Sequence, residues 1–360
     1  MRRAQIAAVA VVAAVTAGGC RSLPPAPPCD CATVLAAEGP SCPPLDLGAV
    51  AGAAPAGRWR NLAFEGGGVK GVAYAGALQT LGAAGGLDGV DRIAGTSAGS
   101  ITALVVALGY TPEEVTRIVL DLDFDEFRDG TFLTDAERLF EQYGWHPAFA
   151  ATCLFECLVE QRLGDRRATF ADLHARAEAD PAFRDLYVVS TDLDRGDWVV
   201  FSHEDPRWAD LPLADAVRAS MAIPFYFTAQ EIAGDVFVDG GVLMNYPIGL
   251  FDQREDAGET LGFYLGGLPD AKPVDDFVAY TEQVFASLLA VQTDDVCADP
   301  DDVRRSVFID PLGIATTDFG LTREQKCALI ESGAKATREY LRQPSTECPE
   351  RMRSERSAGG

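Results

Sequence analysis

Short apolar runs alternate with longer apolar segments along the middle of the chain. Runs typical of β-strands lie at 61–64, 92–94, 186–190, 198–201, 235–239 and 261–265. Segments typical of helices lie at 72–81 and 97–108, and another begins at Thr111, where Thr, Pro and Glu are spaced as in a capping box. Strands that alternate with helices predict an α/β fold with a largely parallel sheet. Two more helices are expected at 277–291 and 324–341.

One apolar segment has two interpretations. Residues 147–163 contain Phe149, Leu154, Phe155, Leu158 and Val159 at helical spacing. The segment suits either a lid over a binding site or a helix in the core. We favour the core helix, because apolar periodicity most often marks a buried face.

The N-terminus resembles an export signal. Arg2 and Arg3 precede an apolar stretch at 6–15 that is too short to span a bilayer. Small residues and then Cys20 follow, which is similar to a bacterial lipoprotein lipobox, although Ala17 stands where Leu is more usual. We expect lipidation at Cys20 and a lipid-anchored protein of the bacterial cell envelope, in the outer membrane or facing the periplasm. Ordinary signal-peptide cleavage is the alternative.

The chain has nine cysteines, so eight remain if Cys20 carries lipid. An even number in an exported protein is typical of disulfides. Cys29, Cys31 and Cys42 lie in a Pro-, Ala- and Gly-rich stretch, where we expect local disulfides. The sequence leaves the connectivity open, including pairing of Cys153 and Cys157 with one of Cys297, Cys327 or Cys348. The spacings lack paired CxxC units, so no zinc site is predicted.

The chain is strongly acidic. Its net charge is −24, from 54 acidic and 30 basic residues. Nucleic-acid binding needs a basic surface, so this balance excludes nucleic acid as an expected partner. It also opposes electrostatic docking on anionic lipid. The simplest consequence is solubility through self-repulsion.

The candidate chemistry begins at Gly95-Thr96-Ser97-Ala98-Gly99, a G-x-S-x-G between a predicted strand and a predicted helix. A serine on such a turn exposes its hydroxyl, and the flanking Gly95 and Gly99 leave room for the tight bend. This geometry suits a nucleophile. The pentapeptide by itself is weak, because chance matches are common.

A second glycine-rich turn, 65–71, follows the first predicted strand. The spacing of Gly66, Gly68 and Gly71 matches a dinucleotide fingerprint, with Asp88 or Asp91 as the acidic ribose partner. The alternative is an oxyanion hole built from backbone N–H groups. We favour the oxyanion hole, because it also explains the serine turn.

The base for Ser97 is not an obvious histidine. His146, His174 and His203 are the three histidines, and none lies in a turn-like setting that follows a predicted strand. Asp239 does, and the following Gly240 and Gly241 allow its loop to approach the serine. A Ser97–Asp239 dyad is therefore possible, although Asp-Gly-Gly alone is more often a simple turn.

Four blocks, in order, resemble the patatin-like phospholipase family over about 61–264. They are the glycine loop 66–71, the serine turn 95–100, the block 218–224 and the aspartate block 239–247. Glu65 stands where many members have Asp, and we expect little consequence. We interpret Ser220 as a packing element near the site and Asp192 as a structural turn acid.

The resemblance implies a three-layer α/β/α fold with a mostly parallel sheet and C-terminal helices. It implies hydrolysis of phospholipid or lysophospholipid esters by a Ser97–Asp239 dyad, without metal or cofactor. Gly66, Gly67 and Gly68 would form the oxyanion hole, with Lys70, Gly71, Gly95, Gly99 and Gly240 in support. For Lys70, a solvated side chain is an equal alternative to a role in the loop. A nucleotide-binding protein and an inactive patatin-fold interaction module are the alternatives for the whole chain.

These expectations divide the chain into five parts. They are a lipoprotein signal peptide at 1–20, a tether with cysteines at 21–58, a patatin-like catalytic domain at 59–268, a C-terminal helical extension at 269–343 and a polar tail at 344–360.

Overall fold

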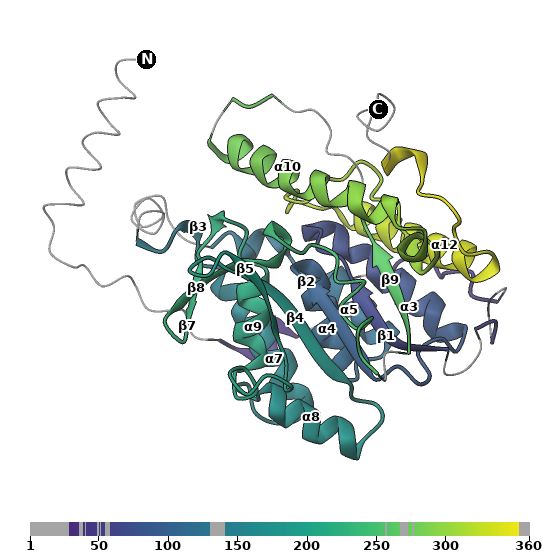
Figure 1. The fold of residues 1–360 in the computed structure, drawn as a ribbon, viewed down its shortest axis with the longest axis horizontal. Helices are drawn as coiled ribbons and strands as arrows, with labels where there is room; N and C mark the ends of the chain where they lie inside the picture. Colours follow the sequence, from purple (N-terminus) through teal and green to yellow (C-terminus); the bar gives the residue numbers. More distant parts are fainter. Residues whose placement is uncertain are drawn as a thin grey trace, which may run out of the picture.

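The expected strands assemble into one mixed sheet in the computed structural model (Figure 1). The structure describes residues 29–35, 39, 41–48, 50, 52–54, 58–129, 141–255, 258–266, 273–275 and 277–352. The sheet order is β10 (Ser306–Phe308), β9 (Glu259–Tyr264), β1 (Trp59–Phe64), β2 (Arg92–Thr96), β4 (Asp185–Asp192), β8 (Asp235–Asp239) and β7 (Gln230–Ile232), with β5 (Asp197–Phe201) also paired to β4. A small separate sheet pairs β3 (Gly144–His146) with β6 (Phe225–Phe227).

The sheet is parallel from β10 to β4 and antiparallel beyond. β10, β9, β1, β2 and β4 run in one direction. β5 and β8 are antiparallel to β4, and β7 is antiparallel to β8. The expectation of a mostly parallel sheet is confirmed for this five-stranded part, while one side of the sheet is built from antiparallel strands.

Of the described helices, the six that begin at residues 73, 98, 112, 149, 277 and 323 lie on expected segments, and the other four were not predicted. The described helices are α2 (Cys31–Val34), α3 (Ala73–Ala83), α4 (Ala98–Ala107), α5 (Pro112–Asp121), α7 (Phe149–Leu163), α8 (Phe170–Ala179), α9 (Leu213–Ser220), α10 (Phe277–Ala298), α11 (Pro300–Arg304) and α12 (Arg323–Arg342). Short 3-10 helices are η1 (Gly68–Val72), η2 (Phe124–Phe127), η3 (Gly240–Val242) and η4 (Glu350–Met352). The capping box at Thr111 is present at the start of α5. Within the described ranges, no helix is both long and apolar enough to cross a membrane.

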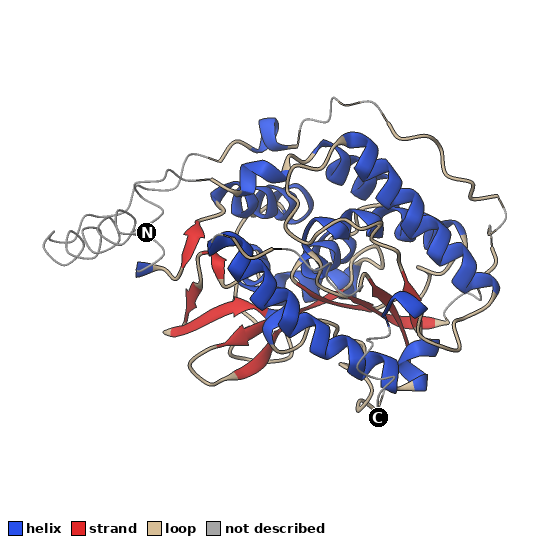
Figure 2. Cartoon of the chain, turned by 90° about the horizontal axis from the view of Figure 1, so that it is seen from above, coloured by secondary structure: helices blue, strands red, loops and turns tan. Residues whose placement is uncertain are grey.

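Side-chain alternation along the strands gives the sheet two buried faces. In β9, Leu261 and Phe263 join the large core beneath α3, α4 and α12. The next residue, Tyr264, belongs to a smaller cluster with Val296 of α10 and Val303 of α11. Helices thus cover both faces, as a three-layer fold requires, with most of them on one side of the strands (Figure 2).

The segment 147–163 is a core helix rather than a lid. In α7, Leu154, Phe155, Leu158 and Val159 are buried, and all four belong to the large core. Its C-terminal end is closed by Gly164 in the left-handed conformation.

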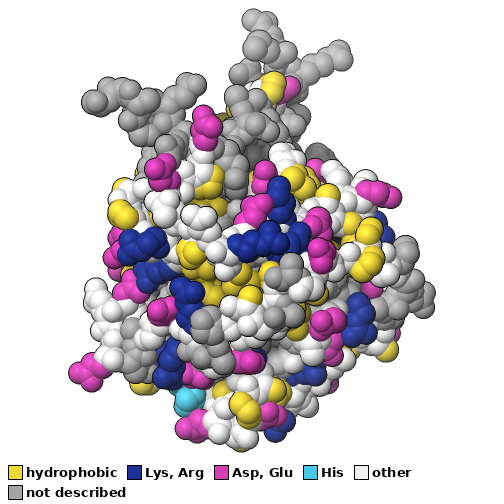
Figure 3. Space-filling model, turned by 90° about the vertical axis from the view of Figure 1, so that its right-hand side faces the viewer, with side chains coloured by type: hydrophobic (Ala, Val, Ile, Leu, Met, Phe, Trp, Pro, Cys, Tyr) yellow, Lys and Arg dark blue, Asp and Glu magenta, His cyan; other side chains and the backbone are white. Residues whose placement is uncertain are grey.

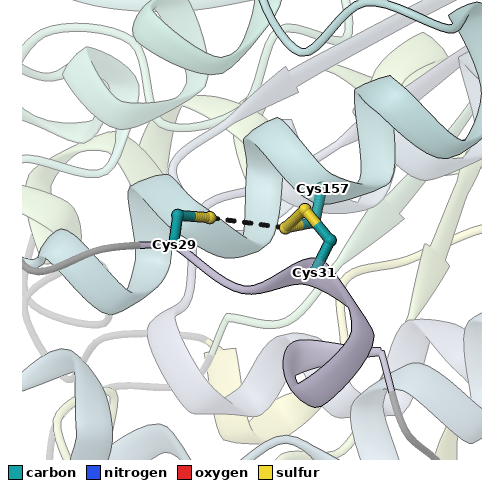
Figure 4. Close-up of side chains that lie close together, drawn as sticks. All are labelled: Cys29, Cys31 and Cys157. Atoms are coloured by element: carbon teal, nitrogen blue, oxygen red, sulfur yellow. Dashed lines mark hydrogen bonds between the residues drawn. A yellow bond between two sulfur atoms is a disulfide. The ribbon is translucent and has the colours of Figure 1, made fainter.

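Four disulfides connect distant parts of the chain. The pairs are Cys29–Cys153, Cys31–Cys157, Cys42–Cys327 and Cys297–Cys348, with sequence separations of 124, 126, 285 and 51 residues. The expectation of local disulfides in the N-terminal stretch is wrong, and so is pairing of Cys153 or Cys157 with the C-terminal cysteines. Cys153 and Cys157 lie four apart and face the same way, so they bind Cys29 and Cys31 side by side, with 3.4 Å between the sulfurs of Cys29 and Cys157 (Figure 4).

Charged side chains of both signs are exposed in the described part of the chain. On the face shown in Figure 3, Lys and Arg side chains are interspersed with Asp and Glu. Many of them form ion pairs, such as the bidentate contact of Arg254 with Glu204. The signal peptide, Cys20 and the end of the polar tail lie outside the described residues.

Candidate active site

Ser97 occupies a strained turn between β2 and α4. Its φ is 53° and its ψ is −123°, a backbone conformation that a residue other than glycine adopts only where the surroundings require it. The flanking glycines explain the turn. A Cβ on Gly95 would lie 2.2 Å from the Gly99 carbonyl oxygen, and a Cβ on Gly99 would lie 2.2 Å from the Phe64 carbonyl oxygen. The backbone therefore closes tightly behind the serine, as in a nucleophile elbow.

The direction of β8 brings Asp239 close to Ser97. Thr96, at the end of β2, pairs with Val189 of β4, and Asp239, at the end of β8, pairs with the next residue, Ser190. β5 pairs with both Val189 and Ser190 and so occupies the other edge of β4. The C-terminal ends of β2 and β8 therefore meet end to end along one edge of β4. This meeting requires β8 to be antiparallel.

Ser220 links the two strand ends. Its Oγ accepts a hydrogen bond from Ser97 N at 2.9 Å and donates one to the Val189 carbonyl at 2.6 Å. Two residues later, the Ala222 carbonyl accepts a hydrogen bond from Asp239 N at 2.9 Å. The end of α9 therefore holds the serine and the aspartate in one hydrogen-bonded frame, which agrees with the expected role of Ser220 as a packing element.

The carboxyl group of Asp239 is fully buried. Its Oδ1 accepts a hydrogen bond from Gly241 N at 2.7 Å, while Oδ2 has no partner of normal hydrogen-bond geometry among the described residues. Burial raises the pKa of Asp239 to about 7, opposed by the Ser97 hydroxyl and then by the Gly241 N–H. The meeting of the two strand ends places the Ser97 hydroxyl beside this carboxyl group, where it favours the charged form, although the two groups are not ideally aligned.

The glycine loop lies against the serine. A Cβ on Gly66 would lie 3.1 Å from Ser97 Cβ, and one on Gly71 would lie 3.1 Å from Ala98 Cβ. Gly66 donates its N–H to the Asn245 carbonyl at 3.0 Å, so this group is not free to bind an oxyanion. In the described part of the chain, the N–H groups of Gly67 and Gly68 have no protein acceptor.

Glu65 anchors this loop, a role that the sequence analysis missed. Its side chain is buried and accepts hydrogen bonds from Asn245 Nδ2 at 2.9 Å and from Leu265 N at 2.6 Å. Burial raises the pKa of Glu65 to about 7, and the charge of Lys70 opposes this rise. Burial lowers the pKa of Lys70, and Glu65 opposes that change. Lys70 is therefore a partly buried neighbour of Glu65 rather than a fully solvated side chain.

The remaining supporting glycine, Gly240, allows the aspartate loop to approach β4. A Cβ there would lie 2.5 Å from the Val189 carbonyl oxygen. Asp192 acts as expected in a turn, where it accepts a hydrogen bond from Arg195 N at 3.1 Å.

The arrangement does not suit the nucleotide hypothesis. Asp88 and Asp91 precede β2, so they lie at the opposite end of the strands from Gly66 and cannot bind a ribose whose phosphates lie on the loop. Asp91 is instead paired with Arg60.

Among the described residues, two clusters of side chains could offer metal ligands, and neither fits an ion in its present form. His174, Asp185 and His203 have ligand atoms within 4.8 Å of one another. The two imidazole rings stack 3.8 Å apart with 6° between their planes, so their lone pairs run parallel and do not converge on one ion. In the second cluster, Cys29, Cys31 and Cys157 are all in disulfides, so none offers a thiolate.

The comparisons with known proteins agree with the geometry. The family model described as patatin-like phospholipase matches residues 62–252. The chain is 31% identical over 302 residues to YqhO, an uncharacterized protein of Bacillus subtilis, and the match covers 78% of this chain and 97% of YqhO. It is 27% identical over 210 residues to the human calcium-independent phospholipase A2-gamma, covering 53% of this chain and 25% of that protein.

A solved structure shares the fold. VipD from Legionella pneumophila superposes with a TM-score of 0.57 at 18% sequence identity, covering 81% of this chain and 68% of that chain. At this identity the similarity concerns the fold alone. The family-model match lies inside the expected 59–268 domain and contains both Ser97 and Asp239.

Proposed function

Because the chain belongs to the patatin-like phospholipase family, we propose that it hydrolyses acyl esters of phospholipids or lysophospholipids with Ser97 as nucleophile and Asp239 as base. The observation that carries this proposal is the unpartnered, buried Oδ2 of Asp239 beside a serine in a strained turn. A buried carboxylate oxygen without a hydrogen-bond donor is rare in folded proteins and calls for a functional reason. A pKa near neutrality also suits a general base.

In the proposed reaction, Ser97 Oγ attacks the ester carbonyl carbon while its proton passes to Asp239. The N–H groups of Gly67 and Gly68 stabilise the oxyanion of the tetrahedral intermediate. The intermediate collapses, and the leaving alkoxide takes the proton from Asp239. Water then attacks the acyl-enzyme, gives a proton to Asp239 and releases the fatty acid, and this proton returns to Ser97 Oγ.

The test uses purified protein and a p-nitrophenyl ester or a phospholipid. Ser97→Ala and Asp239→Asn should each lower kcat by more than about 10³-fold, and Ser97→Ala should abolish labelling by a fluorophosphonate. Ser202→Ala, which changes a buried serine after β5, is the matched control and should keep both properties. EDTA should leave the rate unchanged. Full activity in either dyad variant would exclude the dyad, and a folded protein without labelling would favour an inactive interaction module.

We also propose that the mature protein is anchored in the bacterial cell envelope through lipid on Cys20. The support is the small-residue stretch before Cys20 and its apolar leader. Cys20→Ala should move the protein from the membrane fraction to the soluble fraction. Retention of the variant in membranes that have been washed with high salt and carbonate would contradict the anchor.

A further inference from the structure

Helix α10 carries an exposed apolar face. Val284, Leu288 and Val291 have exposed fractions of 41%, 42% and 59%, and Tyr280, one turn earlier, is 54% exposed. Their spacing of four, four and three residues places them on one side of the helix. Other residues of α10, such as Thr281, Phe285 and Val296, are buried and form the face that packs on the domain. Packing of α10 on the domain therefore does not explain the apolar face, which we call the α10 face.

The α10 face also contains no charged residue. No charged residue occurs from Gln283 to Thr293, in a chain whose net charge is −24. The uncharged stretch ends at Asp294 and Asp295. A helix exposed only to water normally carries charged or polar residues on its outer side. Exposed apolar side chains that gather on one surface instead mark a site of interaction.

Helix α10 is joined to the loop that follows Asp239, which we call the catalytic loop. Gln292 accepts a hydrogen bond from Asn245 N at 2.7 Å and donates one to the Gly241 carbonyl at 2.8 Å. Both partners belong to the loop that follows Asp239. Leu243, in the middle of this loop, is itself 43% exposed. Helix α10 therefore packs directly on the segment that carries the candidate base, and both present exposed apolar side chains.

We propose that the α10 face, with Leu243, docks the protein on an uncharged, zwitterionic phospholipid surface and presents the catalytic loop to it. The proposal rests on the proposed lipid hydrolysis. Ser97 is only 6% exposed, so a phospholipid in a bilayer reaches it only if the bilayer comes up to the loop. Docking by apolar side chains fits a protein whose acidic charge opposes anionic lipid.

The experiment measures binding to sucrose-loaded phosphatidylcholine vesicles by sedimentation. It uses the protein that begins at Arg21, which keeps every described residue and all the disulfide cysteines. The test variant is Val284→Asp with Leu288→Asp. The matched control, Ala175→Asp with Ala179→Asp, adds the same charge to exposed positions of α8. In Figure 1, α8 lies at the lower edge of the molecule and α10 along the upper edge.

The test variant should bind these vesicles at least about tenfold more weakly than the wild type, because aliphatic side chains that leave water contribute more than tenfold to an equilibrium. The control should bind like the wild type. Hydrolysis of a water-soluble p-nitrophenyl ester should be unchanged in both, which would show an intact site. If no form hydrolyses this ester, the proposed function fails, while the vesicle measurement still tests docking.

Two results would overturn the proposal. One is equal vesicle binding by the test variant and the wild type. The other is a wild-type dimer in analytical ultracentrifugation that the test variant abolishes, because the α10 face would then be covered by a second copy of the chain.

Discussion

Replacing Asp239 by Asn should stabilise the protein at alkaline pH. Asp239 is fully buried, and burial raises its pKa from an ordinary value of 3.8 to about 7. A carboxyl group whose pKa is higher in the folded than in the unfolded state binds its proton more tightly when folded. Asn is nearly isosteric, and its carbonyl oxygen can still accept the hydrogen bond from Gly241 N. The substitution therefore removes mainly the cost of holding a buried charge.

The magnitude follows from the linkage between protonation and folding. Below pH 3.8 both states are protonated and the carboxyl group imposes no charge cost. Between pH 4 and 7 the unfolded state releases the proton first, so wild-type stability falls by about 1.4 kcal/mol for each pH unit. Above pH 7 the full cost is present and amounts to about 4 kcal/mol. Asp239→Asn should thus be more stable than wild type by about 1.5 kcal/mol at pH 5 and about 4 kcal/mol at pH 8.

The measurement is urea unfolding of both proteins at pH 5, 6, 7 and 8, followed by circular dichroism with the disulfides intact. Other titrating groups, including Glu65 with its raised pKa, are common to both proteins, so they cancel in the difference. A difference that stays constant from pH 5 to pH 8 would refute the reasoning, and so would a less stable variant at pH 8. Either result would mean that Asp239 does not carry a costly buried charge.

Three further predictions test other parts of the structure. The kcat/KM of the wild type should rise with pH to a plateau with an apparent pKa of about 7, because the base must be ionised; a rate that does not change between pH 5 and 8 would exclude Asp239 in this role. Ser220→Ala should destabilise the protein by about 1–3 kcal/mol and lower kcat more than it raises KM, because Ser97 N loses its acceptor; thermal unfolding and steady-state kinetics check this. Replacing both Cys42 and Cys327 by Ser should lower the free energy of unfolding by about 2–4 kcal/mol in urea, and no loss would show that this crosslink does not constrain the unfolded chain.

The local elements could be predicted from the sequence because their signals are local. The capping box at Thr111 and the glycines around Ser97 each act within one turn of chain, and the structure has the helix and the strained turn where they predict them. Apolar periodicity likewise located α7 in the core.

Other features depend on contacts between distant segments. The apolar run at 235–239 indicates a strand but not its direction, and the approach of Asp239 to Ser97 depends on that direction. The disulfides join cysteines up to 285 residues apart, so spacing does not identify the partners. Glu65 offers no local signal either, because its role comes from Asn245 and Leu265, about 180 and 200 residues later.

If lipid on Cys20 anchors the protein as proposed, the disulfides of Cys29 and Cys31 limit how far the catalytic domain can lie from the anchor. Without these two bonds, the next fastened residue would be Cys42, and the chain from Cys20 to Cys42 would reach about 75 Å at full extension. Because Cys29 is fastened to Cys153 in α7, only the nine peptide units from Cys20 to Cys29 remain, and they reach at most about 30 Å. A lipid-anchored enzyme would then work only on the leaflet that holds it, and reducing the two bonds would extend its range to neighbouring surfaces.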